Sequence, residues 1–308
     1  MTTKLQFQIV ETTKRNRLDN FLSARITTHS KIYLQNRIGA GACRVNGEIA
    51  SRGLHLRAGD AVEIEIDLDA KTSMTPEALP LEIVFEDDAL IVVNKPAEML
   101  AHPSIGQKNG TLLNALSYHL NREKIDSENA TDIISNPSSQ LLRPFLVHRL
   151  DRKTSGLMII AKTMDAMRAL SIRFQKRLVE KTYLAIVQGV VLNEAGTIVA
   201  PIGQDFEERR WMVAANGKAA ETNFRVLQRF FDKTLLELKP VTGRTNQLRI
   251  HCAHIGHSIV GDDRYGSGDF SRLCLHAAKL SFRHPTDERA LVFESDLPED
   301  LKSFLGNC

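Results

Sequence analysis

The chain has 308 residues, of which 43% are hydrophobic and 25% are charged, and its formal net charge is +3. This length suits one large domain or two unequal ones. The sequence contains no apolar run of membrane-spanning length and no signal-peptide core, so we expect a soluble cytoplasmic protein. The four cysteines are scattered without a C-x-x-C pair, which argues for a reducing compartment and against a structural zinc site or a disulfide framework.

Charge is distributed unevenly along the chain. Residues 1–66 carry a net charge of +4 and residues 143–183 a net charge of +7, whereas residues 67–90 carry −6. Basic segments of this kind are expected where a site must meet phosphate groups. The distribution therefore favours a nucleic-acid partner, which the overall charge alone does not suggest.

The N-terminal segment predicts a small domain of two helices and a hairpin. Apolar residues recur at helical spacing over residues 18–26, and a second helix is predicted over 30–38 with a serine as N-cap. The Asn-Gly dipeptide at 46–47 predicts a tight hairpin turn, and apolar residues alternate over 62–66 as a closing strand. A first strand is predicted over residues 5–10.

This order of elements resembles the S4-type RNA-binding domain, which is named after a ribosomal protein. The resemblance implies RNA contacts by Lys31, Arg37 and Arg44. Lys31 stands where the family usually has arginine, so it retains a point charge without the bidentate geometry of a guanidinium. The alternative is a helix-hairpin domain with a solvated basic face.

We place this first domain at residues 1–70, a polar linker with two prolines at 71–80, and a second domain at 81–308. In the second domain, residues 90–93 predict a buried strand that leads to Asn-Lys-Pro. A helix is predicted over residues 111–120. The polar segment 121–140 that follows predicts a mobile insertion.

The centre of the chain, residues 146–163, reads LVHRLDRKTSGLMIIAKT. It predicts a short charged loop followed by a buried strand over residues 157–161. Its one acid, Asp151, is flanked by Arg149, Arg152 and Lys153, and nearby cations lower the pKa of a carboxyl group and keep it available as a nucleophile. The alternative for such a cluster is a surface ion pair beside a strand.

Beyond this motif, residues 164–178 predict a helix and residues 181–187 a strand that contains Tyr183. Three further strands are predicted over 196–200, 218–230 and 234–239. Short strands separated by turns, with few helices between them, indicate a mixed and mainly antiparallel sheet with helices at its faces, which is an α+β fold.

A second charged motif, TGRTNQLRIH, occupies residues 242–251. It follows a predicted strand through a glycine and opens a helix. Arg244 is therefore expected at a loop–helix junction, where its guanidinium can reach a nearby carboxylate.

In order along the chain, the segment 91–103 with Asn-Lys-Pro, the His-Arg-Leu-Asp motif of 148–151, the Lys-x-Tyr of 181–183, the motif of 242–251 and the segment 275–285 resemble the RluA-type pseudouridine synthases. The resemblance covers nearly the whole chain. It implies a cofactor-independent and metal-independent isomerase that converts specific uridines of RNA to pseudouridine.

The resemblance also implies roles for individual residues. Asp151 would be the nucleophile, Tyr183 would stack on the flipped base, and Arg244 would pair with Asp151. Arg149, Arg152 and Lys181 are expected to contact RNA. Glu98 and Asn246 replace the glycine and histidine usual in the family, and their roles stay open, as does the choice between ribose and uracil as the atom that Asp151 attacks.

The S4-type domain favours large-subunit (23S) ribosomal RNA over transfer RNA as the substrate, and we expect a monomer. Two other functions are consistent with parts of the sequence. One is a non-catalytic S4-type RNA-binding or ribosome-associated factor, although an acid inside a basic patch opposes phosphate binding. The other is a metal hydrolase that uses His251, His254 and His257, although three-residue spacing spreads these side chains around a helix and no His-Glu-x-x-His motif is present.

Overall fold

The computed structural model describes residues 2–10, 17–26, 29, 31–67, 75–104, 106–127, 141–205, 210–268 and 270–306. The chain divides into two compact units. The first comprises Met1–Ala78, Pro103–Asn109 and Ser117–Leu142, and the second comprises Leu79–His102, Gly110–Leu116 and Arg143–Cys308. Residues 71–74 of the predicted linker, and the predicted N-cap Ser30, lie outside the described residues.

The first unit is built on a four-stranded antiparallel sheet with the order β1-β4-β2-β3. Its elements are β1 (Thr2–Gln8), α1 (Leu18–Arg25), α2 (Lys31–Gly39), β2 (Cys43–Val45), β3 (Glu48–Ile49) and β4 (Ala61–Asp67). Asn46 and Gly47 join β2 to β3 with φ angles of 52° and 86°, the left-handed backbone that a tight hairpin turn requires. The two helices, the hairpin and the closing strand are confirmed, and the first strand begins three residues earlier than predicted.

Helix α3 (Leu112–Ser127) is longer than the helix predicted over residues 111–120, and its last seven residues belong to the predicted insertion. The buried Asn121 explains the extension. Its Nδ2 donates to the carbonyls of Ser117 and Leu142, and its Oδ1 accepts the N–H of Leu142 at 2.7 Å. The first part of the predicted insertion is therefore ordered helix, and residues 128–140 lie outside the described residues.

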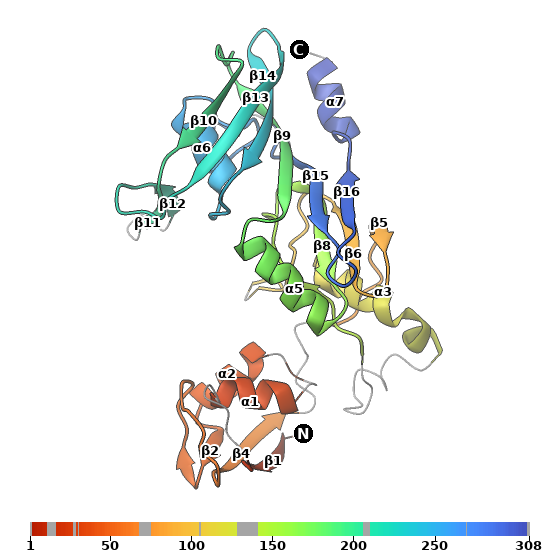
Figure 1. Cartoon of the computed structure of the whole chain (residues 1–308), viewed down its shortest axis with the longest axis vertical. Coiled ribbons are helices and arrows are strands. Elements are labelled where there is room, and N and C mark those ends of the chain that lie inside the picture. Colours follow the sequence, from red (N-terminus) through yellow and green to blue (C-terminus); the bar gives the residue numbers. More distant parts are fainter. Residues whose placement is uncertain are drawn as a thin grey trace. The chain divides into compact units, whose positions relative to one another are not determined.

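The second unit contains a ten-stranded sheet whose main path runs β10-β13-β14-β9-β15-β8-β6-β5, with β16 beside β15 and β7 beside β8 (Figure 1). Its strands are β5 (Glu82–Glu86), β6 (Leu90–Lys95), β7 (Phe145–Leu146), β8 (Ser155–Ala161), β9 (Glu180–Gln188), β10 (Ala195–Val199), β13 (Glu221–Arg229), β14 (Lys233–Pro240), β15 (Leu275–Arg283) and β16 (Ala290–Glu294). All neighbouring strands are antiparallel except the pair β8 and β15. The predicted α+β class with a mainly antiparallel mixed sheet is confirmed.

The remaining elements of this unit are a hairpin of β11 (Ile202–Asp205) and β12 (Arg210–Val213), and the helices α5 (Met164–Gln175), α6 (Gln247–His254) and α7 (Glu299–Gly306). Helix α5 packs against β7 and β8, and α6 packs against β12 and β14. Among the described residues, no helix combines the length and the apolar character needed to cross a membrane.

Strand β8 anchors the central charged loop at the middle of the sheet. All seven of its residues are buried, and Gly156 pairs with Ala277 of the parallel neighbour β15. The φ angle of Gly156 is 116°, and a Cβ at this position would lie 2.4 Å from the carbonyl oxygen of Ala277. Only glycine permits this close approach, so the Thr-Ser-Gly turn after the charged loop is what allows β8 to join β15.

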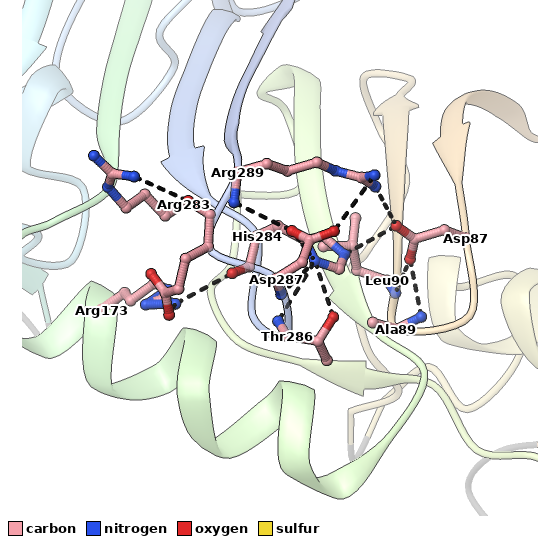
Figure 2. A network of polar contacts seen from close by, with 10 residues as sticks. Asp87, Ala89, Leu90, Arg173, Arg283, His284, Thr286, Asp287 and Arg289 are labelled. Atoms are coloured by element: carbon pink, nitrogen blue, oxygen red, sulfur yellow. Dashed lines mark hydrogen bonds and ion pairs between the residues drawn. The ribbon is translucent and has the colours of Figure 1, made fainter.

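A polar network centred on the buried His284 joins two turns of the second unit to helix α5. The Nε2 atom of His284 lies 2.9 Å from Asp87, and its Nδ1 atom lies 3.0 Å from Asp287. Arg289 contacts both aspartates at 3.1 and 3.4 Å, and Arg173 of α5 donates to the carbonyl of His284, as Figure 2 shows. The β5–β6 turn, the β15–β16 turn and α5 are thereby held together.

Candidate active site

A cavity of about 690 Å³ in the second unit brings together four segments that are distant in sequence. They are the loop before β8, the C-terminal end of α5, the start of β9, and the segment from the end of β14 into α6. Five of the residues predicted to act in catalysis or RNA binding line it: Arg149, Asp151, Lys181, Tyr183 and Arg244. Arg152 does not line the cavity, and Lys31, Arg37 and Arg44 belong to the first unit.

The loop that carries Asp151 is fixed by His148. The His148 ring stacks on Phe174 of α5, with centroids 4.6 Å apart, and its Nε2 accepts the backbone N–H of Ile159 in β8 at 2.9 Å. Burial lowers the pKa of His148 to about 3, so the ring is neutral at physiological pH and can act as this acceptor. The histidine of the His-Arg-Leu-Asp motif is therefore a structural anchor between α5 and β8.

Lys95 at the end of β6 supports the same loop from the other side. Its side chain is fully buried, and its Nζ donates to the carbonyls of Pro96, Met99 and Arg152 at 2.7, 2.9 and 3.2 Å. Burial lowers the pKa of Lys95 to about 8, against the opposing influence of Glu98 and Asp151. The Asn-Lys-Pro segment was noted from sequence, but nothing in it indicated that the lysine would hold the backbone next to Asp151.

Glu98 adopts a left-handed backbone conformation with a φ of 64°. This conformation favours glycine, which gives a physical reason for the glycine usual at this position in the resembling family. The Glu98 carbonyl accepts a hydrogen bond from Arg152 Nε at 3.2 Å, and its carboxylate lies 3.6 Å from the same nitrogen. The substitution thus gives Arg152 a partner.

The predicted pairing of Arg244 with Asp151 is wrong. The carboxylate of Asp151 pairs with Arg249, whose Nη1 lies 3.8 Å from Oδ2, and Arg244 Nε donates to the carbonyl of Ala219 at 3.1 Å. Arg249 lies in the first turn of α6 and is 7% exposed, whereas Arg244 lies in the loop before that helix. Both arginines belong to the motif of residues 242–251, and only the packing of α6 distinguishes the one that faces the acid.

The loop before α6 is organised by the buried Gln247, whose side-chain amide makes four hydrogen bonds. Its Oε1 accepts from the Thr242 hydroxyl at 2.7 Å and from the Arg244 backbone N–H at 3.0 Å. Its Nε2 donates to the Glu221 carbonyl at 2.8 Å and to the Thr222 hydroxyl at 3.0 Å. A fully satisfied buried amide is rigid, so this loop presents Arg244 and Arg249 in a fixed arrangement.

Asn246 closes the same loop in a left-handed conformation with a φ of 53°, which asparagine tolerates better than most residues. Its Nδ2 donates to the Tyr265 hydroxyl at 3.1 Å, and that hydroxyl donates to the carbonyl of Trp211 at 2.9 Å. The side chain of Asn246 therefore connects α6 to the β11–β12 hairpin.

The pKa of Asp151 differs from the sequence prediction. Burial raises it above the ordinary aspartate value, Arg249 and Arg149 oppose that rise, and Asp262 adds to it. The prediction that the adjacent cations lower the pKa of Asp151 is wrong, because two of these cations pair with other acids. Lys153 lies 2.8 Å from Asp263, and Arg152 lies 3.6 Å from Glu98. Asp151 is consequently a carboxyl group whose charged form is disfavoured by burial and favoured by Arg249 and Arg149.

Tyr183 reaches the cavity from β9. Its hydroxyl makes no hydrogen bond within the part of the chain that the structure describes. Burial, with a further contribution from the charge of Asp151, raises the pKa of Tyr183. The side chain therefore presents a protonated phenol and an aromatic ring to whatever occupies the cavity.

Cations without protein partners also line the cavity. The side chains of Arg149, Arg177 and Lys181 form no hydrogen bond or ion pair with any described residue. Burial and the charge of Arg177 lower the pKa of Lys181. Partly buried charges of one sign that lack counterions are costly, so the cavity favours an anionic ligand.

The other basic residues of α5 are engaged by the protein. Arg168 pairs with Asp165 at 3.2 Å, and Arg173 pairs with Glu288. Four basic residues lie in or just after α5, namely Arg168, Arg173, Lys176 and Arg177, and of these Arg177 alone lines the cavity.

The three basic residues predicted to contact RNA in the first unit carry internal contacts. Lys31 donates to Asn20, Arg37 Nε donates to the Glu65 carbonyl at 2.9 Å, and Arg44 Nη1 donates to the Gly47 carbonyl at 3.0 Å. Each contact involves one nitrogen of the side chain, and other donors of each remain.

Two of the three histidines considered as metal ligands, His251 and His257, make structural contacts. His251 is fully buried, with Nδ1 at 3.0 Å from the Thr222 hydroxyl and Nε2 at 3.0 Å from the Ala200 carbonyl. His257 Nδ1 lies 2.8 Å from the carbonyl of Gln188. Within the described ranges, no group of three His, Cys, Asp or Glu side chains is arranged to hold a metal ion.

Comparison with known proteins adds independent information. Residues 89–254 match a family described as RNA pseudouridylate synthase. The chain is 36% identical over 301 residues to a Bacillus subtilis protein named uncharacterized RNA pseudouridine synthase YlyB. This alignment covers 96% of this chain and 95% of the Bacillus subtilis protein. It is also 36% identical over 301 residues to ribosomal large subunit pseudouridine synthase D of Pseudomonas aeruginosa, with 92% of this chain and 89% of that protein covered.

A solved structure is similar over much of the chain. Human RNA pseudouridylate synthase domain containing 1 aligns with a TM-score of 0.57 and 26% identity, and the alignment covers 75% of this chain and 95% of the human chain. The ordered motifs, the cavity and these similarities agree on one family.

Proposed function

Since the chain belongs to the RNA pseudouridylate synthase family, we propose that it converts specific uridines of large-subunit ribosomal RNA to pseudouridine with Asp151 as nucleophile. The observation that carries this proposal is the position of one carboxylate, Asp151, in a cavity whose other charged groups are cations. A carboxylate in such a place weakens anion binding, so its presence there favours chemistry over simple RNA binding.

The substrate uridine would leave its stack to reach this cavity, at a cost of about a few kcal/mol. Stacking on Tyr183 and phosphate contacts by Arg149 and Lys181 would offset that cost. Arg149 is adjacent to Asp151 in sequence and also suits the space that the uridine vacates. Arg177 and Arg244 line the same cavity and would add to its affinity for the backbone.

In the reaction, the Asp151 carboxylate adds to the ribose or to the uracil, and the bond between ribose C1′ and uracil N1 breaks. The freed base rotates, C5 of uracil bonds to C1′, and the bond that Asp151 formed breaks, which returns the free carboxylate. The proton on C5 is lost and N1 gains a proton, so the product is an isomer of the substrate. Arg249 holds Asp151 beside the base, and Tyr183 holds the ring of the base. Because no electrons are exchanged with an acceptor, the reaction requires no redox cofactor.

We propose that residues 1–70 act as an S4-type RNA-binding domain, that residues 71–80 act as a linker, and that residues 81–308 form the catalytic domain. Lys31, Arg37 and Arg44 on α2 and β2, together with Arg152, would contribute phosphate contacts outside the cavity. Support for ribosomal RNA as the substrate comes from relatives named ribosomal large subunit pseudouridine synthase D in Vibrio cholerae and Pseudomonas aeruginosa.

The test is to map pseudouridines in total RNA from a strain that lacks this protein. We expect one or more pseudouridines to disappear from large-subunit ribosomal RNA and to return with the wild-type gene, but not with an Asp151→Asn gene. Loss of a site in transfer RNA alone would overturn the substrate assignment. An unchanged pseudouridine map would overturn the activity.

A further inference from the structure

Asp262 is a fully buried carboxylate behind the cavity. Its Oδ2 and Oδ1 accept from Nε and Nη2 of Arg249, both at 2.7 Å, and Oδ1 also accepts the backbone N–H groups of Arg264 and Tyr265 at 2.9 and 3.0 Å. A bidentate pair of this geometry, with further backbone donors, fixes a guanidinium in both position and orientation. Asp262 does not itself line the cavity.

Arg249 is held from a second side as well. Its guanidinium lies over the ring of Tyr265, 5.1 Å from the centroid, and Tyr265 is fixed by Asn246 and the Trp211 carbonyl. The guanidinium therefore has one orientation, set by the loop after α6 and by α6 itself.

Arg249 is shared unequally among three acids, of which only Asp262 is within hydrogen-bonding distance, while Asp151 and Asp263 each lie 3.8 Å away. Two nitrogens are within hydrogen-bonding distance of Asp262, whereas the third, Nη1, lies 3.8 Å from Asp151, which is beyond a hydrogen bond. The positive charge of Arg249 therefore stabilises the Asp151 carboxylate without a strong hydrogen bond to either of its oxygens. A carboxylate in a close bidentate pair would be a weaker nucleophile.

We propose that Asp262 is a positioning residue of this active site, whose carboxylate holds the Arg249 guanidinium at a distance that orients Asp151 and leaves it free to react. This inference rests on the proposed function. The inference goes beyond the proposed function because it assigns a role to Asp262, which neither lines the cavity nor contacts Asp151.

The charged and titratable groups that face Asp151 come from every neighbouring element: Arg149 of its own loop, Arg249 of α6, Lys95 of β6, Tyr183 of β9, and Asp262 itself. On its own side, Asp262 faces Arg249 and the thiol of Cys252 in α6. Removing the charge of Asp262 takes away a repulsion that raises the pKa of Asp151, and it releases Arg249 to approach Asp151. Both effects lower the pKa of Asp151.

The experiment compares the pH dependence of kcat for the wild-type enzyme and for Asp262→Asn, on a large-subunit ribosomal RNA fragment that contains the target uridine. We expect kcat to fall by a factor on the order of 10² in the variant, because a displacement of about 1 Å in a reacting group has this effect. The acid limb of the profile should move to lower pH, while KM stays within a few-fold of the wild-type value. An unchanged acid limb and an unchanged kcat would overturn the proposal.

The adjacent Asp263 supplies a comparison, because it also lies 3.8 Å from Arg249 Nη2 but is exposed, pairs with Lys153 and lies outside the cavity. Asp263→Asn keeps the bidentate pair of Asp262 with Arg249, so it should move the acid limb and kcat much less than Asp262→Asn does. If Asp262→Asn does not fold, Asp262→Glu keeps the charge and displaces the guanidinium by a methylene. It should lower kcat without moving the acid limb, and a wild-type kcat in this variant would contradict the positioning role.

Titration of the Asp151 side-chain carboxyl by carbon NMR in the RNA-free protein separates this inference from the proposed activity. The resonance can be assigned from its absence in Asp151→Asn. A lower pKa in Asp262→Asn supports the positioning role even if no RNA substrate is turned over, and an unchanged pKa overturns it even if the enzyme is active.

Discussion

The Nη1 atom of Arg249 lies 3.8 Å from the Oδ2 atom of Asp151, and this ion pair joins the first turn of α6 to the loop before β8. It connects two motifs that are about a hundred residues apart in the sequence. Asp262 behind Arg249 and Lys95 beside the loop hold the two partners in place.

Arg249→Lys tests this pair directly. A lysine keeps the charge but loses the planar fork, so it cannot bond both oxygens of Asp262 and also face Asp151. We expect kcat for pseudouridine formation to fall by a factor on the order of 10–10² with a small change in KM, measured by single-turnover and steady-state kinetics.

The same substitution at Arg244 is the matched control, because Arg244 lines the cavity but is bound to the carbonyl of Ala219. Arg244→Lys should raise KM more than it lowers kcat. Equal losses of kcat in the two variants would contradict the assignment of Arg249 as the partner of Asp151.

Much of the second unit could be predicted from sequence because its strands are either apolar runs, as in β8, or alternating segments, as in β14, and turns separate them. The strand predicted over 157–161 is the core of β8, and that predicted over 181–187 is the core of β9. The resemblance pointed to Asp151, Tyr183 and Lys181, and these three residues line one cavity. Local periodicity and ordered motifs are sufficient for these features.

The electrostatics of the site could not be predicted, because they depend on side-chain direction. Arg152 and Lys153 adjoin Asp151 in sequence but face Glu98 and Asp263. Burial by distant segments, which sequence does not show, then raises the pKa of Asp151. For the same reason the sequence pointed to Arg244, and not to Arg249, as the partner of Asp151.

Tyr183→Phe should leave stability and RNA affinity nearly unchanged. The hydroxyl makes no hydrogen bond within the described residues, so its removal should change the free energy of unfolding by less than about 0.5 kcal/mol. Tyr183→Leu removes the aromatic face and should weaken RNA binding by about 1–3 kcal/mol, as measured by equilibrium binding. Equal affinity of the Phe and Leu variants would exclude stacking on this ring.

Lys95→Met should destabilise the catalytic unit. The change leaves the carbonyls of Pro96, Met99 and Arg152 without their buried donor, and we expect a loss of at least about 2 kcal/mol in the free energy of unfolding. Lys162→Met removes a surface ion pair with Glu86 and should cost less than about 1 kcal/mol. Similar losses in the two variants, measured by denaturant titration, would argue against a special role for Lys95.

Lys95 also predicts a pH dependence. Its pKa is about 8 in the folded protein against an ordinary value of 10.5, so between these values the unfolded chain binds more protons than the folded one. The contribution of Lys95 to stability should therefore rise with pH from about 8 to 10.5. The difference in unfolding free energy between wild type and Lys95→Met should widen across this window, and a constant difference would contradict the buried ammonium.

Asp87→Asn tests the network of Figure 2. Burial raises the pKa of Asp87. The N–H groups of Ala89 and Leu90 and the ring of His284 lower it by more than burial raises it, so the pKa of Asp87 lies below the ordinary value for aspartate. Asp87 thus contributes stability that is present above its unfolded pKa and is lost as pH falls through the lower folded value.

We expect Asp87→Asn to cost about 1–3 kcal/mol at neutral pH, with less effect under strongly acidic conditions. The exposed neighbour Asp88 provides the control, and Asp88→Asn should change stability by less than about 0.5 kcal/mol. A loss in Asp87→Asn that does not depend on pH would indicate that the side chain acts through packing alone.

The most direct test of the central claim is the activity of Asp151→Asn on a ribosomal RNA fragment that carries the target uridine. The isosteric amide keeps the shape of the side chain but removes the nucleophilic carboxylate, so we expect RNA binding at wild-type affinity or tighter and no detectable pseudouridine by mass spectrometry. Pseudouridine formed by the purified variant at a rate near that of the wild-type enzyme would contradict the assignment of Asp151 as the nucleophile.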